Sequence, residues 1–248
     1  GLGGWVKRRA QRTPDRVAII FEGASLTYRE FDDRIRRLAL GLQEMDVRHG
    51  DRIGFLGPNH PAFLEVLFAA ASLGAFAVPV NHRLAPDLVD HIMRDSGCRV
   101  VVYGAAATPL VDHLLRTFPD AAWIPLHRDG PPTADAGPSG RDYEDLLATT
   151  SPDRIEAPVR DSDPALLVYT SGTTGAPKGV PLSHANVRTN AVNMLVSGDF
   201  HRDDVTLAIA PFHRVGGLGV TLLETLLVGG EVVVMPDFDA GEALRLIE

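Results

Sequence analysis

The sequence predicts an α/β fold in which helices flank largely parallel sheets, arranged in two subdomains. Short apolar runs alternate with helix-length amphipathic segments along most of the chain, and no internal repeat breaks that pattern. Strands separated by helices of this length form right-handed βαβ units, which place neighbouring strands parallel. With 248 residues, 45% of them hydrophobic, the chain is long enough to bury such a core.

Several expected helices begin at capping residues. Thr27 and Glu30 form a capping box at the first, Pro61 opens a helix that ends before Gly74, and Ser183 caps a helix that runs to about residue 196. Further helices are expected over 86–95, 107–118 and 217–228. The expected strands are 52–56, 76–80, 99–103, 122–125, 165–169, 205–210 and 231–235.

The alternation stops between residues 128 and 164. Residues 129–140 are rich in Pro, Gly and Ala and predict a mobile surface loop. We therefore expect a first α/β subdomain region over 1–164 and a second region over 165–248. Asp239 and Glu242 predict a capping box for a last helix, yet no cap follows before Glu248. The second region is thus expected to be truncated at its C-terminal end.

Composition narrows the class of partner. A formal net charge of −8 argues against nucleic acid as the main partner.

Cys98 is the only cysteine, so no internal disulfide forms. We expect a buried structural thiol and a cytoplasmic protein. The most apolar stretch, 62–80, contains Glu65, Gly74 and Pro79 and predicts a buried helix, a turn and a strand instead of a membrane span.

The strongest functional signal is the segment 169–180, YTSGTTGAPKGV, between an apolar strand and a short return strand. Its glycines let the backbone turn and bring N–H groups close to a ligand, while its hydroxyls and one lysine add donors. This chemistry suits a polyphosphate. The residues that supply it are Thr170, Ser171, Gly172, Thr173, Thr174, Gly175, Lys178 and Gly179.

Better-known nucleotide-binding motifs fit this segment less well. A Walker A loop needs a glycine directly before the lysine and a Ser or Thr after it, but Lys178 stands three residues after Gly175 and is followed by Gly179. No dinucleotide-binding fingerprint lies between a strand and a helix. A plain Gly/Thr turn seldom combines so many hydroxyls with a lysine.

Residues 169–180 closely resemble the signature loop of the adenylate-forming (AMP-binding) superfamily, which includes acyl- and aryl-CoA ligases, peptide-synthetase adenylation domains and firefly-type luciferases. The resemblance extends over nearly the whole chain. Within the superfamily, the sequence is most similar to fatty-acyl-CoA ligases. It implies the N-terminal part of the acyl-CoA synthetase-like fold. Supporting segments are LTYRE at 26–30, GDRI at 50–53, GAFAVPVN at 74–81 and PFH at 211–213.

The resemblance implies an activity with two half-reactions. A carboxylate, expected to be that of a fatty acid, attacks ATP to give acyl-AMP and pyrophosphate, and the thiol of coenzyme A then displaces AMP. The loop 170–178 would hold the β- and γ-phosphates, with Lys178 acting on the leaving pyrophosphate and Thr170 near the Mg²⁺. The expected partner is a small carboxylic acid, with no nucleic acid and no integral membrane contact, and the sequence does not indicate an oligomeric state.

His213 is the second candidate catalytic residue. It follows the expected strand 205–210, at the carboxyl end where α/β sheets place ligands. On spacing alone an ordinary loop histidine is the better interpretation. The resemblance instead places the matching residue beside the substrate carboxylate or at the entrance of the acid pocket.

Two alternatives stay open at this point. One is an aryl- or amino-acid adenylating enzyme that loads a carrier protein, and the other is a nucleotide-binding module without complete catalytic apparatus. Family members are about twice as long as this chain, and their later segments supply further ATP and Mg²⁺ contacts. We therefore expect the 248-residue chain alone to be inactive.

Overall fold

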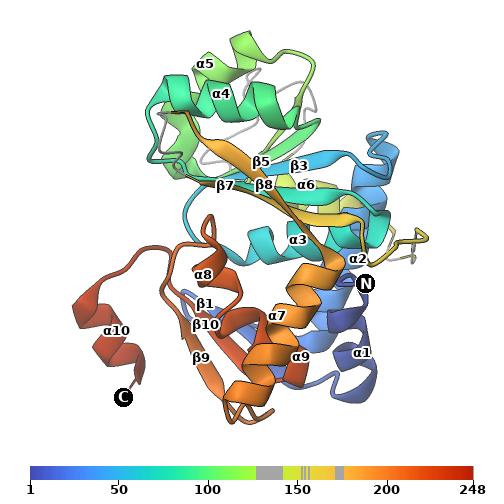
Figure 1. The fold of residues 1–248 in the computed structure, drawn as a ribbon, viewed down its shortest axis with the longest axis vertical. Helices are drawn as coiled ribbons and strands as arrows, with labels where there is room; N and C mark the ends of the chain where they lie inside the picture. Colours follow the sequence, from blue (N-terminus) through green and yellow to red (C-terminus); the bar gives the residue numbers. More distant parts are fainter. Residues whose placement is uncertain (127–141, 152, 154, 156, 171–175, 248) are drawn as a thin grey trace.

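The computed structural model describes residues 1–126, 142–151, 153, 155, 157–170 and 176–247, in which the strands form two sheets (Figure 1). The larger sheet has the order β6-β5-β3-β4-β7-β8 and the smaller β2-β1-β10-β9. The larger sheet consists of β3 (Arg52–Leu56), β4 (Phe76–Val80), β5 (Val100–Tyr103), β6 (Ala122–Pro125), β7 (Pro164–Thr170) and β8 (Lys178–Ser183). The smaller sheet consists of β1 (Val17–Phe21), β2 (Ala24–Thr27), β9 (Val205–Ala208) and β10 (Glu231–Val234).

Strand pairing within the sheets is largely parallel, as predicted. Only the β1–β2 and β7–β8 pairs are antiparallel among the described strands. The two sheets do not follow sequence order. β7 and β8 join β3–β6, while β1 pairs with β10 across most of the chain, with Ile20 opposite Val233. The first and last parts of the chain therefore share the smaller sheet.

The helices form layers around the sheets (Figure 1). α4 and α5 cover one face of the larger sheet, and α2 and α3 lie between the two sheets. The described helices are α1 (Gly4–Arg12), α2 (Tyr28–Glu44), α3 (Pro61–Leu73), α4 (Pro86–Ser96), α5 (Thr108–Thr117), α6 (Tyr143–Thr149), α7 (His184–Ser197), α8 (Val215–Leu218), α9 (Leu222–Val228) and α10 (Ala240–Ile247).

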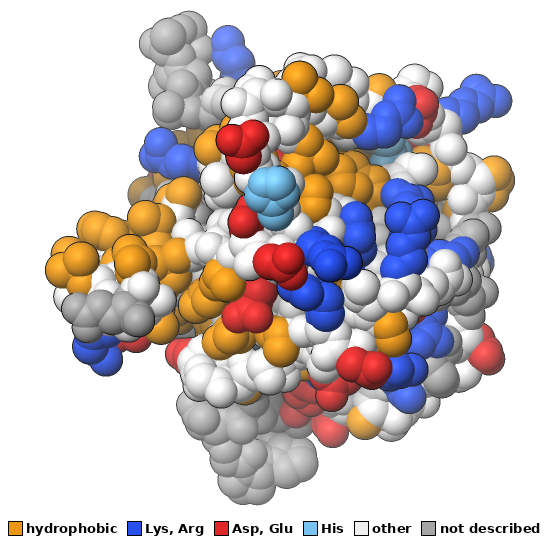
Figure 2. Space-filling view, turned by 90° about the horizontal axis from the view of Figure 1, so that it is seen from below, with side chains coloured by type: hydrophobic (Ala, Val, Ile, Leu, Met, Phe, Trp, Pro, Cys, Tyr) orange, Lys and Arg blue, Asp and Glu red, His pale blue; other side chains and the backbone are white. Residues whose placement is uncertain are grey.

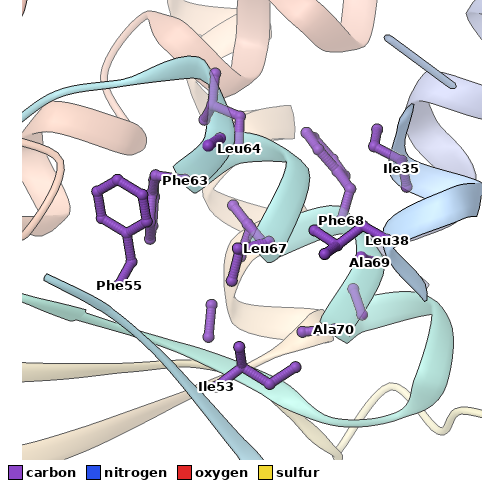
Figure 3. Packing of buried hydrophobic residues seen from close by; sticks show 14 of the residues in the cluster. Ile35, Leu38, Ile53, Phe55, Phe63, Leu64, Leu67, Phe68, Ala69 and Ala70 are labelled. Atoms are coloured by element: carbon purple, nitrogen blue, oxygen red, sulfur yellow. The ribbon is translucent and has the colours of Figure 1, made fainter. Parts of the chain in front are cut away.

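The main core surrounds α3, which is buried on nearly every side. Phe63 lies beside Phe55 of β3, with ring centroids 5.5 Å apart, while Phe68 points toward Ile35 and Leu38 of α2 (Figure 3). Apart from Glu65 and Ser72, every residue of α3 is apolar, which suits a position between two layers. The core thus ties the larger sheet to the helices that face the smaller one.

Local signals predicted these helices correctly. Thr27 and Glu30 form the predicted capping box, in which each side chain bonds the other residue's backbone N–H. Gly74 ends α3 in the left-handed conformation, with φ 71°, which glycine adopts without steric cost. Ser183 caps α7 by accepting from Asn186 N. Cys98 is buried as expected, and burial raises the pKa of its thiol to about 11.

The structure also contains elements that the sequence patterns above do not predict. β1 and β2 form a hairpin whose turn places Glu22 and Gly23 at positive φ, and α1 and α6 are additional helices. The helix expected over 217–228 is two helices, α8 and α9. The break coincides with a hydrogen bond from Asn190 Nδ2 of α7 to Gly219 O at 2.6 Å, a tertiary contact that local pattern does not reveal. The expected loop at 129–140 lies outside the described residues.

A buried ion pair joins α2 to α3. Glu65 is fully buried, and its carboxylate accepts from Arg34 Nε at 2.6 Å and from the Tyr143 hydroxyl of α6 at 2.5 Å. Arg34 also donates to Glu144 at 2.6 Å. Because these partners replace the water lost on burial, the charge of Glu65 is tolerated inside the core.

The C-terminal helix leaves apolar side chains uncovered. Hydrophobic side chains gather over α10, the orange group at the left of Figure 2. They include Leu244 and Ile247, which are 65% and 71% exposed. Asp239 Oδ1 accepts from Glu242 N at 2.7 Å, one half of the expected capping box. No described helix is both long and apolar enough to cross a membrane.

Candidate active site

The predicted phosphate-binding loop lies between two antiparallel strands. β7 ends at Thr170, β8 begins at Lys178, and these two residues are partners in the strand register. Both are exposed. β7 runs parallel to its other neighbour, β4, so the loop between β7 and β8 begins at the carboxyl edge of the larger sheet. Open α/β sheets place their ligands at this edge.

Part of the loop is not described. The structure describes Thr170 before it and the residues from Ala176 onward after it. The phosphate contacts expected of the residues between them therefore stay predictions. These residues, which lie outside the described residues, are Ser171, Gly172, Thr173, Thr174 and Gly175.

Helix α4 fixes both sides of the loop. The hydroxyl of Tyr169 donates to Asp95 Oδ2 at 2.6 Å, and His91 Nε2 donates to the carbonyl oxygen of Pro177 at 2.9 Å. Burial, with Asp95 as its hydrogen-bond partner, raises the pKa of Tyr169, so the hydroxyl keeps its proton. Sequence patterns do not indicate these contacts, since they depend on how α4 packs on the sheet.

Gly179 has a different role from the one its motif suggested. It lies within β8 opposite Tyr169, and it is not among the residues at positive φ, so it does not form the turn. A Cβ atom at this position would lie 3.1 Å from both the Tyr169 ring and the Leu167 side chain. The glycine therefore leaves room for Tyr169 to lie across the hairpin, where it can reach α4.

His213 lines a pocket of about 350 Å³ between the two sheets. The pocket lies where β3 and β4 of the larger sheet and β9 and β10 of the smaller sheet reach their carboxyl ends. Its wall is largely apolar and includes several aromatic rings. Four phenylalanines and two histidines are among the lining residues: Phe55, Phe63, His82, Phe212, His213 and Phe238. His82 comes two residues after the end of β4, and that position alone could have indicated it.

The pocket keeps His213 in its neutral form. Burial, reinforced by the nearby Arg214, His82 and Arg83, lowers the pKa of His213 to about 4. A neutral imidazole carries one N–H donor and one acceptor nitrogen. It can therefore donate a hydrogen bond to a carboxylate without transferring a proton to it. Arg83 is paired with Asp237 at 2.7 Å across the rim.

The hairpin and the pocket share one edge of the larger sheet. β4 supplies Val80 to the pocket and is followed there by Asn81, and it is the direct neighbour of β7, which carries Thr170. Within the described residues, no hydrogen bond or ion pair joins His213 to Thr170 or Lys178. The structure thus brings the candidates to one edge without placing them in contact.

The fit to Mg²⁺ rests on a single oxygen. Mg²⁺ usually takes one or two protein oxygens and fills its other positions with phosphate oxygens and water. The exposed hydroxyl of Thr170 at the base of the loop offers one such oxygen, although not a carboxylate. In the described part of the chain, no group of three or more His, Cys, Asp or Glu side chains could hold a metal ion on its own.

Comparison with known proteins identifies the class. A model of the AMP-binding enzyme family matches residues 6–248. The chain therefore belongs to the AMP-binding enzyme family, as its loop predicted. Its fold is that of an acyl-CoA synthetase-like N-terminal domain. The crystal structure of the N-terminal domain of FACL13 from Mycobacterium tuberculosis matches with a TM-score of 0.85 and 30% identity, covering 99% of this chain and 59% of that chain.

Two of the curated relatives are a feruloyl-CoA synthase and a fatty-acid–CoA ligase. A feruloyl-CoA synthase from Amycolatopsis sp is 39% identical over 248 residues, which make up 100% of this chain and 46% of that protein. The long-chain-fatty-acid–CoA ligase FadD13 of Mycobacterium tuberculosis is 32% identical over 247 residues, 98% of this chain and 47% of that protein. The chain thus spans about half the length of the curated relatives it matches.

Proposed function

We propose that this chain forms the N-terminal part of a full-length, AMP-forming acid–CoA ligase, which activates a carboxylic acid with MgATP and then forms an acyl-CoA thioester. The observation that carries the proposal is the loop 170–178, framed by the paired Thr170 and Lys178 at the carboxyl edge of the sheet. The family match over residues 6–248 supports it.

The first half-reaction assigns a task to each end of the loop. A carboxylate oxygen of the acid attacks the α-phosphorus of ATP, the bond to the bridging oxygen breaks, and pyrophosphate leaves. Negative charge grows on that leaving group. The ammonium of Lys178 and the N–H groups of the loop would neutralise it, and the hydroxyl of Thr170 would contribute to holding a Mg²⁺ ion, which would supply further positive charge there. The loop thereby keeps the leaving group in line with the attacking oxygen.

The second half-reaction uses coenzyme A as a co-substrate. Its thiol loses a proton and attacks the acyl carbonyl carbon, and the bond to AMP breaks to give the thioester. Cys98 takes no part in this step, because the thiol is buried and its raised pKa keeps it protonated. These 248 residues contain no other thiol that could carry the acyl group.

His213 is proposed to orient the acid. Its neutral imidazole, half-buried in the pocket wall, would donate a hydrogen bond to one carboxylate oxygen and leave the other free to attack. The hydrogen bond must not withdraw so much charge that the nucleophile is lost. A neutral donor meets that condition better than an imidazolium.

Two acid classes compete for the pocket. The sequence resemblance favours a fatty acid, in line with the FadD13 relative. An aryl acid is the second candidate, because the pocket wall holds Phe55, Phe63, Phe212 and Phe238, and the feruloyl-CoA synthase is 39% identical. Flat aromatic substrates pack well against such rings. A carrier-protein acceptor and a nucleotide-binding module without turnover are the remaining alternatives.

A panel of acids offered to the full-length protein tests the proposal. Fatty acids of several chain lengths, hydroxycinnamic acids and amino acids would each be supplied with MgATP, with and without coenzyme A, and pyrophosphate and thioester would be measured. We expect acid-dependent pyrophosphate release, and thioester only with coenzyme A. Pyrophosphate without thioester would favour a carrier-protein acceptor. ATP binding with no acid-dependent release would favour the binding module.

We propose a cytoplasmic location and a small-molecule acid as the main partner. A net charge of −8 disfavours nucleic acid and anionic membrane surfaces. A single free, buried thiol is typical of a reducing compartment. Fractionation of cells that produce the full-length protein would test the location.

A further inference from the structure

One buried amide joins the two sheets beside the candidate acid pocket. Asn59 follows β3 and is only 6% exposed. Its side chain bonds to the backbone of the segment after β9. Nδ2 donates to the carbonyl oxygen of Ala210 at 3.1 Å, and Oδ1 accepts from Phe212 N at 2.8 Å.

A third hydrogen bond joins Asn59 to the segment after β10, the strand next to β9. The backbone N–H of Asn59 donates to the carbonyl oxygen of Pro236, just after β10, at 3.1 Å. One residue that follows β3 of the larger sheet therefore holds the segments that follow β9 and β10 of the smaller sheet. The orientation of the amide is determined by its partners, since a backbone N–H only donates and a carbonyl only accepts.

The segment held by Asn59 carries His213. Phe212, bonded to Asn59 through its N–H, also buries its ring beside Phe63 of α3, with centroids 5.9 Å apart. Side chain and backbone of Phe212 are thus both fixed, and His213 is the next residue in the chain. The hydrogen bonds of Asn59 therefore act on the backbone directly beside the imidazole.

We propose that Asn59 is a positioning residue for the acid site, which holds the 210–213 segment so that the His213 imidazole faces the pocket. The proposal rests on the proposed function in one respect: it takes His213 to contact the acid. Asparagine supplies both a donor and an acceptor at this reach, whereas Asp lacks the donor and Leu lacks both groups. Loss of the bond to Phe212 N leaves a buried backbone N–H unpaired, and loss of the bond to Ala210 O leaves a half-buried carbonyl without this partner.

Substitution of Asn59 should change the use of the acid but not of ATP. In the full-length protein, Asn59→Asp keeps the acceptor for Phe212 N and places a carboxylate oxygen against Ala210 O. We expect the KM for the acid to rise roughly tenfold, in line with the loss of a part-buried hydrogen bond and its replacement by two facing oxygens, while the KM for ATP stays within about twofold. Asn59→Leu removes both bonds and should have a larger effect in the same direction.

A matched control separates positioning from stability. Thr150 is 3% exposed, and its hydroxyl donates to Leu146 O at 2.6 Å at the end of α6, away from the pocket. Thr150→Val removes one buried hydrogen bond of similar strength. We expect it to lower the melting temperature without changing either KM. If Asn59→Asp behaves like Thr150→Val, the positioning role is wrong.

Two further readouts distinguish failure of this proposal from failure of the proposed function. In the His213→Ala background, Asn59→Asp should raise the acid KM less than about twofold, because the residue it positions is absent; full additivity would contradict the proposal. The imidazole signal of His213 in a ¹H–¹³C NMR spectrum should shift in Asn59→Asp but not in Thr150→Val. If the His213 signal does not shift in Asn59→Asp, the positioning role is wrong, whether or not the protein activates an acid. If the signal shifts but the protein activates no acid, only the proposed function is contradicted.

Discussion

Thr170 and Lys178 face each other across the β7–β8 hairpin, as partners in the antiparallel register. This pairing places the hydroxyl expected to meet Mg²⁺ and the cation expected to meet pyrophosphate at the two ends of one loop. Because the strands on both sides are hydrogen-bonded, the ends of the loop have a defined separation before any ligand binds. The hairpin therefore fixes the two ends of the predicted phosphate-binding loop.

Lys178→Ala should slow the first half-reaction without unfolding the protein. The exposed ammonium is proposed to neutralise the leaving pyrophosphate, and loss of such a group costs about 10²–10³-fold in rate. Acid-dependent ATP–pyrophosphate exchange measures this step. Lys7 is the other lysine of the sequence, so Lys7→Ala is the matched control and should leave exchange unchanged. Equal loss in both variants would remove Lys178 from the mechanism.

His213→Ala should impair use of the acid more than use of ATP. The imidazole lines the pocket but has no described contact with the phosphate-loop ends. We expect the acid KM to rise roughly tenfold, in line with one lost hydrogen bond to a charged group, with little change in the KM for ATP. Steady-state kinetics with each substrate varied in turn provides both values. An unchanged acid KM and adenylation rate would make His213 an ordinary loop residue.

Gly217 and Gly216 should respond oppositely to alanine. A Cβ atom at Gly217 would collide with the backbone carbonyl of Pro211, whereas a Cβ at Gly216 meets nothing within 4 Å. Gly217→Ala must displace the segment that carries His213 and should cost about 1–3 kcal/mol of unfolding free energy. Gly216→Ala, within the same short helix, should be neutral or slightly stabilising. Urea unfolding of both variants measures the difference, and equal stability would contradict the close approach.

Stability should fall as the pH is lowered from about 6.5 toward 4, in part because of His213. Burial holds its folded-state pKa near 4, below the ordinary value of 6.5. Between these values the unfolded chain binds the proton that the folded chain excludes, so protonation favours unfolding. His213→Gln removes this contribution, and its urea midpoint should depend less steeply on pH over that window. Identical slopes for the two proteins would mean that the imidazole is not buried in the neutral form.

The elements that could be predicted well from the sequence are those whose signals are local. The Thr27 capping box, the helix from Pro61 and its end at Gly74 all depend on residues within one or two turns. The β7–β8 hairpin around the phosphate loop was also accessible, because a return strand directly follows the motif. The alternation of strands and helices was enough to predict a largely parallel α/β architecture.

The parts that could not be predicted depend on contacts between distant segments. Ile20 and Val233 pair although more than half of the chain separates their strands. The hydrogen bonds of Asn59 to the backbone of Ala210 and Phe212 likewise join residues whose spacing carries no periodic signal. Sequence patterns therefore identified the candidate groups at the carboxyl edge, while their supporting contacts required the structure.

Acid-dependent ATP–pyrophosphate exchange, measured side by side on the full-length protein and on the purified 248-residue chain, tests the central claim most directly. The loop is proposed to act only on the leaving group, and each positioned donor or charge missing around the α-phosphorus costs about 10²–10³-fold. We predict clear exchange with at least one fatty or aryl acid in the full-length protein and none in the chain alone. A folded full-length protein without exchange for any acid would contradict the ligase assignment, and exchange by the 248 residues alone would show that they already hold every group the adenylation step needs.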